Sequence, residues 1–339
     1  MFGPRKTPIR LTTERPRLLV FRNGMVGNTL MATPVFRALK QRFPGSFLGV
    51  VVDAMGKSLL AANPFVDEFF VFNRKKDSLG RQIELVRLWR SRRFDVSLHL
   101  RSGVRNEMLA LAAGIPIRVG TKLRGSPQFL SHVLPKIEDL HVLKVAERFL
   151  AETFGETLPL HPPELFPNPA AGAEVERFLA ERGLARGRFL VVHPAGESHG
   201  KLVWGMEHHP ALAEHLWRRL GLPSVFVGAP HEQAYVAERL PQSEATAHYF
   251  PQPIDLISEL IARAAALFCN DSGPAHMAEA WGVPKVMVYA DRGEVLTKWA
   301  PVNPERALIL FREEFSRPET FERIADWLAA RIAPAAPGA

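Results

Sequence analysis

The stretch Cys269-Asn270-Asp271-Ser272-Gly273-Pro274-Ala275-His276 joins an apolar run, Ala264 to Phe268, to a short helical pattern that Gly282 closes. A buried strand that turns at once into a helix leaves backbone N–H groups beyond its carboxyl end, where they and the helix dipole favour an anion. Ser272 suits the N-cap, and Pro274 suits the first turn. A well-capped helix with an incidental histidine explains the same residues, so this stretch alone predicts only a strand–turn–helix unit of an α/β fold.

The same alternation recurs on both sides of this stretch. Near the N-terminus, an apolar strand at 17–22, a glycine-rich turn at 23–28, helical spacing at 29–43 and a strand at 47–52 form a βαβ unit. The remaining predicted strands are 68–72, 95–100, 189–193, 224–227 and 285–289, and the remaining predicted helices are 79–92, 104–113, 143–154, 173–182, 212–220, 255–264 and 320–332, with one more beginning near Glu232. This pattern predicts an α/β protein with doubly wound sheets.

A proline-rich segment divides the alternation into two halves. Residues 157–171 are predicted to be the interdomain linker, because their prolines disfavour regular structure. The other predicted segments are a basic N-terminal tail at 1–16, a Rossmann-like domain at 17–156, a second Rossmann-like domain at 172–315, a C-terminal helix at 316–333 and a disordered tail at 334–339.

Composition indicates an ordinary globular chain of two domains, with 339 residues of which 47% are hydrophobic. No run of about 18 apolar residues is present, and no apolar segment follows the basic N-terminus as in a signal peptide. We therefore expect a cytoplasmic protein. The lone Cys269 excludes an intramolecular disulfide and a cysteine-based metal cluster, and its place in a predicted strand indicates a small buried residue rather than a nucleophile.

The net charge of +8 implies an anionic partner. The chain shows no helix-turn-helix, zinc finger or aromatic RNA-binding motif, so nucleic acid is not the expected partner. A phosphorylated substrate and an anionic membrane fit the charge equally well. Arg101 and Arg105 follow a predicted strand directly and are placed to bind an anionic ligand. Lys57 and 74–76 could extend the same basic wall, although solvated surface charge is the simpler interpretation of 74–76.

Four loops follow predicted strands at the carboxyl ends, where ligands bind in such sheets. They are residues 22–28, 193–201, 227–232 and 270–276. The first is rich in glycine but matches neither the dinucleotide fingerprint nor the P-loop. Lys201 suits a phosphate, and Glu232 suits the hydroxyls of a ribose. Each loop alone also fits plain turn chemistry, but three of them in the second half indicate a nucleotide site.

Three motifs, in this order and spacing, resemble those of glycosyltransferase family 9, the ADP-heptose:lipopolysaccharide heptosyltransferases and their relatives. They are Leu18-Leu19-Val20-Phe21-Arg22-Asn23-Gly24-Met25-Val26-Gly27-Asn28-Thr29-Leu30 with Ala32-Thr33-Pro34, His193-Pro194 through Lys201 with Trp204, and Asn270-Asp271-Ser272-Gly273-Pro274 with His276. The resemblance runs from about Arg17 to Trp327.

The resemblance implies the GT-B architecture, in which two Rossmann-like domains face a central cleft. It also implies inverting transfer of a heptose or related sugar from an ADP-sugar to a lipid A–core or other glycan acceptor, without a cofactor or a required metal. The donor would bind the C-terminal half and the acceptor the N-terminal half. Because such an acceptor is anchored in a membrane and the chain is basic, the resemblance also implies weak, salt-removable attachment to the inner membrane. The expected donor contacts are Lys201, Glu232, Ile254, Asp271, Ser272, Gly273 and His276, and the expected acceptor contacts are Gly24, Met25, Gly27, Arg101 and Arg105.

Within this resemblance, two positions depart from the family pattern. The family has Gly-Asp where this chain has Gly27-Asn28, and that aspartate is the family's general base. An asparagine amide has no useful proton affinity near neutral pH, although Asn28 can orient a hydroxyl or cap the helix that follows it. Either another group, such as His99 or Asp53, accepts the proton, or transfer is slow or absent. The segment from Lys201 to Trp204 also holds one extra residue, which alters the reach of Lys201.

Two functions therefore stand side by side. One is an active glycosyltransferase of the family 9 type, and the other is a silent relative that binds a nucleotide sugar or glycan without transferring it. Asn28 is the residue that favours the silent alternative.

Overall fold

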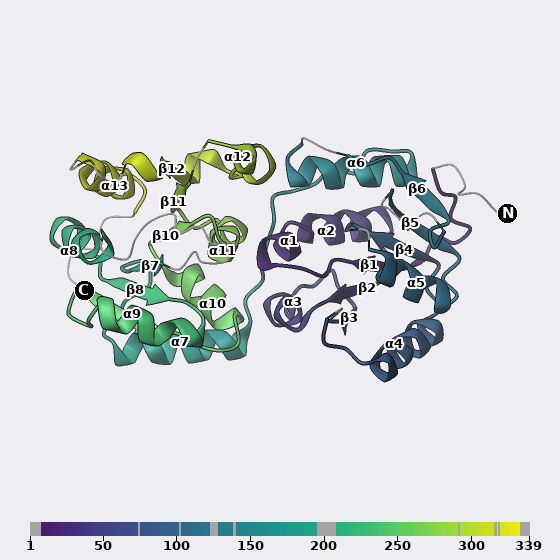
Figure 1. Ribbon diagram of the computed structural model, residues 1–339, viewed down its shortest axis with the longest axis horizontal. Coiled ribbons are helices and arrows are strands. Elements are labelled where there is room, and N and C mark those ends of the chain that lie inside the picture. Colours follow the sequence, from purple (N-terminus) through teal and green to yellow (C-terminus); the bar gives the residue numbers. More distant parts are fainter. Residues whose placement is uncertain are drawn as a thin grey trace. The chain divides into compact units, whose positions relative to one another are not determined.

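The computed structural model describes residues 8–73, 75–101, 103–122, 128–137, 140–194, 208–290, 292–314, 317 and 319–332. The chain forms two compact units (Figure 1). The N-terminal unit comprises Met1–Phe166 with Thr297–Trp299, and the C-terminal unit comprises Pro167–Leu296 with Ala300–Ala339. Each unit contains a six-stranded parallel sheet flanked by helices. These two sheets confirm the predicted doubly wound α/β class.

The N-terminal sheet has the strand order β3-β2-β1-β4-β5-β6. Its strands are β1 (Arg17–Phe21), β2 (Phe47–Val52), β3 (Glu68–Val71), β4 (Val96–His99), β5 (Ile117–Thr121) and β6 (His132–Leu134). Its helices are α1 (Val26–Leu30), α2 (Thr33–Arg42), α3 (Ala54–Leu60), α4 (Leu79–Arg92), α5 (Val104–Ala112) and α6 (Val142–Phe154). The order reverses between β1 and β4, so the loops after these two strands open at the switch point where ligands bind.

The C-terminal sheet has the order β12-β11-β10-β7-β8-β9. Its strands are β7 (Leu190–His193), β8 (Ser224–Val227), β9 (Thr246–Tyr249), β10 (Ala266–Asn270), β11 (Lys285–Tyr289) and β12 (Ala307–Phe311). Its helices are α7 (Pro169–Glu181), α8 (His209–Leu220), α9 (Gln233–Arg239), α10 (Asp255–Arg263), α11 (Gly273–Trp281) and α13 (Glu319–Ala329). The helix α12 (Glu294–Trp299) begins in this unit, and its last three residues, Thr297–Trp299, belong to the N-terminal unit. The switch point of this sheet lies between β7 and β10.

Large aromatic side chains fix the helices to the N-terminal sheet. Trp89 of α4 is fully buried, and its ring meets Phe21 of β1 edge to face at 5.3 Å between centroids. Phe70 of β3 contacts the same indole at 6.3 Å. Burial of such a ring contributes about 3 kcal/mol, so Trp89 is a principal anchor of α4.

The first helix differs from its prediction. The spacing predicted one helix over 29–43, but the chain forms α1 and α2, and α1 already begins at Val26 inside the predicted turn. Gly24, at φ +151°, makes the turn instead. Asn28 consequently lies within α1, whose N-cap is Met25, and the prediction that Asn28 caps a helix is wrong.

Other differences concern short elements. The helix α7 begins at Pro169, inside the segment predicted as linker, because the Asn168 side chain accepts hydrogen bonds from the N–H groups of Ala170 and Ala171. Strands β5, β6, β9 and β12 were not predicted. Residues 1–7 of the basic tail and the tail at 334–339 lie outside the described residues. In the described part of the chain, no helix is long and apolar enough to cross a membrane.

Candidate functional site

The loop after β10 has the predicted strand–turn–helix form. Ser272 is the N-cap of α11, and Pro274 lies in its first turn. The Ser272 side chain makes no capping bond, and its Oγ lies instead 3.3 Å from Nδ1 of His193, at the end of β7. The N–H groups of the first turn thus receive no side-chain cap from Ser272, which leaves them suited to an anionic ligand.

Burial shifts the pKa values of the titratable groups around this loop. Asp271 is exposed at the end of β10, and partial desolvation raises the pKa of its carboxyl group. Burial lowers the pKa of His193 to about 4, although nearby Glu232 opposes the shift, so the imidazole is neutral near pH 7. Burial also raises the pKa of the Cys269 thiol to about 12, which confirms it as a buried residue rather than a nucleophile.

The other predicted donor contacts lie on neighbouring elements. His276 is 9% exposed in the second turn of α11. Glu232 ends the short 3-10 helix Pro230–Glu232 after β8, and its Oε2 accepts from the N–H of Ala229 at 2.6 Å. The ribose contact predicted for Glu232 therefore depends on its other oxygen. Ile254 is half-buried at the start of α10. Lys201 and Trp204 lie outside the described residues.

In the N-terminal unit, Arg22 holds Asn28. Its Nε donates to the Asn28 carbonyl at 2.8 Å, and its Nη2 donates to the Asn28 Oδ1 at 2.7 Å. The Arg22 side chain is almost fully buried, and burial together with the nearby charge of Arg101 lowers its pKa to about 10. Arg22 therefore remains charged near pH 7, although its two hydrogen-bond acceptors at Asn28 are neutral. A buried cation of this kind is stabilised by an anionic ligand.

The glycine-rich loop brings Arg101 to the same place. At φ +151°, Gly24 has a conformation that other residues rarely adopt, and a Cβ at this position would lie 3.4 Å from Arg101 Nη1 and 3.7 Å from the Asn28 side chain. Gly27 is buried within α1, whereas Met25 is 59% exposed. Among the predicted acceptor contacts, Gly24 and Arg101 are thus brought together beside Asn28.

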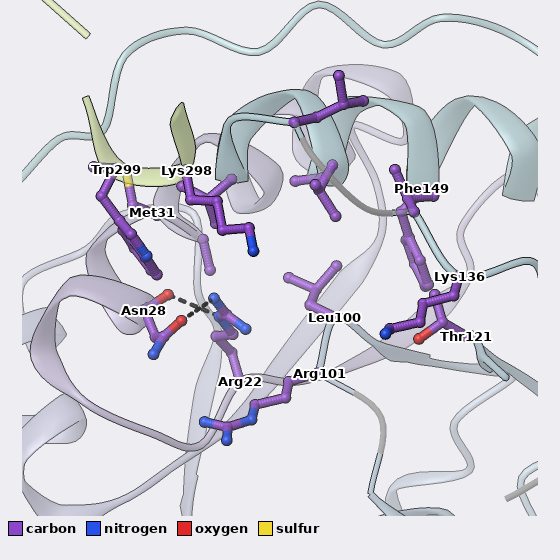
Figure 2. Close-up of a pocket in the computed structure, with 16 residues that line it drawn as sticks. Arg22, Asn28, Met31, Leu100, Arg101, Thr121, Lys136, Phe149, Lys298 and Trp299 are labelled. Carbon is purple, nitrogen blue, oxygen red and sulfur yellow. Dashed lines mark hydrogen bonds between the residues drawn. The ribbon is translucent and has the colours of Figure 1, made fainter. Parts of the chain in front are cut away.

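A cavity of about 640 Å³ opens above these residues (Figure 2). Its cationic lining residues are Arg22, Arg101, Lys136 and Lys298, the last from the Thr297–Trp299 segment of this unit. No described residue that lines it is Asp or Glu. Apolar side chains of α6, among them Phe149, form part of the wall. Four cations beside an apolar wall suit an anionic group carried on a partly apolar molecule.

A second cavity of about 200 Å³ adjoins the glycine-rich loop. Gly24, Asp53 and Arg101 line it, and Asp53 is the one carboxylate among the described residues that line either cavity. Asp53 is also the N-cap of α3, where its Oδ1 accepts from the N–H of Gly56 at 2.8 Å. Arg105 is exposed on α5 and lines neither of these two cavities.

The burial of His99 argues against it as the substitute base. Its ring is fully buried in β4 and stacks on Phe21 with centroids 4.4 Å apart. Its Nε2 lies 3.1 Å from Ser97 Oγ, and its Nδ1 has no partner among the described residues. Burial, with a smaller effect from Arg118, lowers its pKa to about 3. No acceptor hydroxyl reaches such a ring.

The buried His99 makes the free energy of unfolding depend on pH. An unfolded histidine takes up a proton below about pH 6.5, whereas His99 in the folded chain does so only near pH 3. The unfolded state therefore binds more protons in this window, and the free energy of unfolding falls as pH decreases from about 6.5 towards 3. We expect His99→Phe to reduce this fall in denaturant titrations at about pH 7 and about pH 5. Exposed His231→Phe is the control, and equal pH dependence of the two variants would contradict the assignment.

Arg22, Lys136 and the α6 wall were missed as site residues. Arg22 directly follows β1 within the motif that begins at Leu18, so its position at a strand end could have identified it as a site residue. Lys136 follows the three-residue strand β6, which is too short for its alternation to be recognised. In the described part of the chain, no group of three or more His, Cys, Asp or Glu side chains could hold a metal ion.

Sequence comparisons point to one family. The model of glycosyltransferase family 9 (heptosyltransferase) matches residues 83–324. A putative glycosyltransferase of Haemophilus influenzae is 26% identical over 305 residues, which cover 85% of this chain and 86% of that relative. Lipopolysaccharide heptosyltransferase 2 of Escherichia coli is 24% identical over 289 residues, which cover 80% of this chain and 82% of that relative.

Solved structures share the fold. ADP-heptose lipopolysaccharide heptosyltransferase II of E. coli superposes with a TM-score of 0.76 at 22% identity, covering 93% of this chain and 98% of that structure. E. coli heptosyltransferase WaaC with ADP-2-deoxy-2-fluoro heptose gives a TM-score of 0.71 at 16% identity, covering 93% and 99%. These likenesses confirm the predicted GT-B fold class.

Proposed function

Because the chain belongs to glycosyltransferase family 9, we propose that it transfers a heptose or related sugar from an ADP-sugar to an anionic acceptor of the lipopolysaccharide core type. The observation that carries this proposal is the cavity beside the glycine-rich loop, with its four cations and without a described acidic lining residue. Such a cavity suits the phosphates or carboxylates of a core saccharide. The buried, charged Arg22 would then gain the anionic partner that Asn28 does not supply.

The donor would bind at the N-terminus of α11. Its diphosphate would accept hydrogen bonds from the first-turn N–H groups and from Ser272, while neutral His193 keeps the Ser272 hydroxyl in place. WaaC of E. coli, which shares this fold, is described in complex with an ADP-sugar analogue, and this supports an ADP-sugar as donor. We place the reaction at the cytoplasmic face of the inner membrane, where an acceptor anchored in lipid meets a nucleotide sugar from the cytoplasm.

We further propose that Asp53 takes the proton from the attacking acceptor hydroxyl. Asn28 cannot accept it, and His99 is buried, whereas Asp53 lines the cavity next to Gly24. One carboxylate oxygen caps α3, which orients the side chain and leaves the second oxygen for the proton. Attack on the anomeric carbon from the face opposite the leaving ADP inverts the configuration.

The test is to incubate the protein with ADP-heptose and a truncated lipid A–core acceptor, and to follow the acceptor by mass spectrometry. We expect a mass gain of one heptose and release of ADP. The rival function is a silent binder, which Asn28 favours. It predicts binding of the ADP-sugar in calorimetry without any mass gain. Neither binding nor a mass gain would refute both functions.

A further inference from the structure

Helices α4 and α5 expose apolar side chains on their outer faces. On α5, Val104, Met108 and Leu111 are spaced as one helical row and are each about 40% exposed. On α4, Leu79 and Ile83 are 73% and 44% exposed one turn apart. The opposite faces of both helices are buried in one core cluster that includes Leu85 and Leu109. The side chains of these two exposed rows therefore do not contribute to the hydrophobic core of this unit.

The two rows lie next to each other. The helices follow parallel strands of one sheet and run side by side (Figure 1). Their C-terminal ends are joined, because Arg90 Nη2 of α4 donates to the Ala112 carbonyl of α5 at 2.5 Å. Counting back two turns along both helices places Ile83 level with Val104 and Arg105. Leu79, Ile83, Val104, Met108 and Leu111 thus form one surface, here called the outer apolar patch.

Positive charge surrounds the outer apolar patch. The segment from Lys75 to Arg93 contains seven Lys or Arg residues and two Asp or Glu residues. Arg87 and Arg90 are exposed on the Leu79–Ile83 face of α4, by helical spacing, and exposed Arg105 follows Val104. Two of these cations are paired with carboxylates, Arg81 with Glu84 at 3.0 Å and Arg92 with Glu68 at 2.7 Å. The surface therefore combines separate apolar side chains with excess cations.

We infer that the outer apolar patch docks on an anionic lipid bilayer. Scattered apolar side chains among cations match the interfacial zone of a membrane, where apolar groups enter the acyl boundary and cations contact lipid phosphates. A second copy of the chain fits less well, because a two-fold interface would set Arg87, Arg90 and Arg105 against the same residues.

The position of this surface fits the acceptor. Lys75, in the turn before α4, lines the smaller cavity together with Asp53, as do Gly103 and Asn106 at the start of α5. Docking there would bring this cavity towards the membrane that anchors the acceptor. This consequence rests on the proposed function, whereas the membrane contact itself does not.

The experiment is co-sedimentation with phosphatidylethanolamine vesicles that contain or lack phosphatidylglycerol. We expect binding only with phosphatidylglycerol, weakened by salt, and a loss of roughly tenfold or more for the double variant Ile83→Glu with Met108→Glu. The matched control is Tyr235→Glu on α9 of the C-terminal unit, which alters a side chain that is 46% exposed and should keep wild-type binding. Unchanged thermal melting of both variants would show that they fold.

Three results would overturn the inference: equal binding with and without phosphatidylglycerol, wild-type binding by the double variant, or an equal loss in the control. A dimer in sedimentation velocity that only the double variant abolishes would assign the patch to a second copy and would also overturn it. A transfer assay with a delipidated core oligosaccharide as acceptor separates the two proposals. The double variant should retain transfer to this acceptor, because no membrane is involved. Absence of this transfer in the wild-type protein would count against the proposed function alone.

Discussion

Asp53→Asn should lower the rate of sugar transfer by about 10²–10⁴-fold, because the variant loses the proposed proton acceptor and retains nearly the same shape. Asparagine is as good an N-cap as aspartate, so its side-chain oxygen should still accept from Gly56 and hold α3. The fall should appear in kcat at saturating acceptor and donor, with little change in donor affinity. Initial rates from the mass-spectrometric transfer assay, with calorimetry for the donor, measure both quantities.

Asp77→Asn is the matched control. Asp77 Oδ2 accepts from the N–H of Asn73 at 2.9 Å, so it is also a carboxylate that holds a turn, but it lines neither of the two cavities. Its variant should transfer at close to the wild-type rate. If Asp53→Asn retains the wild-type rate, or if both variants lose the same amount, Asp53 is not the base.

Lys285→Met should destabilise the C-terminal unit by about 3–5 kcal/mol. Lys285 of β11 and Glu279 of α11 form an ion pair whose side chains are each 2% exposed. The other Glu279 oxygen accepts from the N–H and the side-chain amide of Asn303, at 2.9 and 2.8 Å. Removal of the lysine leaves a buried carboxylate without its cation. Because α11 carries the donor loop, the affinity for ADP-sugar should fall as well.

Thermal and denaturant unfolding measure the loss, which should lower the melting temperature by roughly 10 °C. Lys144→Met is the control, because Lys144 forms an exposed pair with Glu147 and its loss should cost less than about 1 kcal/mol. Adding Glu279→Gln to Lys285→Met should recover much of the stability, since no buried charge remains. Melting of Lys285→Met at the wild-type temperature would contradict this account of the pair.

Long, strongly patterned segments were predictable from the sequence. Helix 79–92 was predicted at its observed bounds. In the structure, the Ser78 side chain caps this helix and Arg93, at φ 51°, ends it. The strand–turn–helix at β10 and α11 was predicted from its buried apolar run and its Pro274. Strands β6 and β9 have three and four residues, and their polar or half-buried positions obscure the pattern. Short strands of this kind are stabilised by their neighbours in the sheet rather than by their own sequence.

Side-chain roles were less predictable than the backbone. The position of His99 at a strand end suggested access to a ligand, but its ring turns into the core and stacks on Phe21. Strand alternation alone does not tell which end residue faces the site. The hydrogen bond between the side chains of Arg22 and Asn28 joins residues six positions apart. It depends on α1 beginning earlier than predicted, at Val26. Long-range packing of α6 formed the cavity wall that no single motif indicated.

The transfer assay, run in parallel on the wild-type chain and on Asn28→Asp, tests the central claim most directly. We predict that the wild-type protein adds one heptose to the anionic core acceptor. The new carboxylate would lie where Arg22 Nη2 donates at 2.7 Å, and this pairing would lower its pKa and leave it a weak base, so Asn28→Asp should change the rate by less than about tenfold. No transfer by the wild-type chain, with rapid transfer by Asn28→Asp, would contradict the account and identify a silent binder.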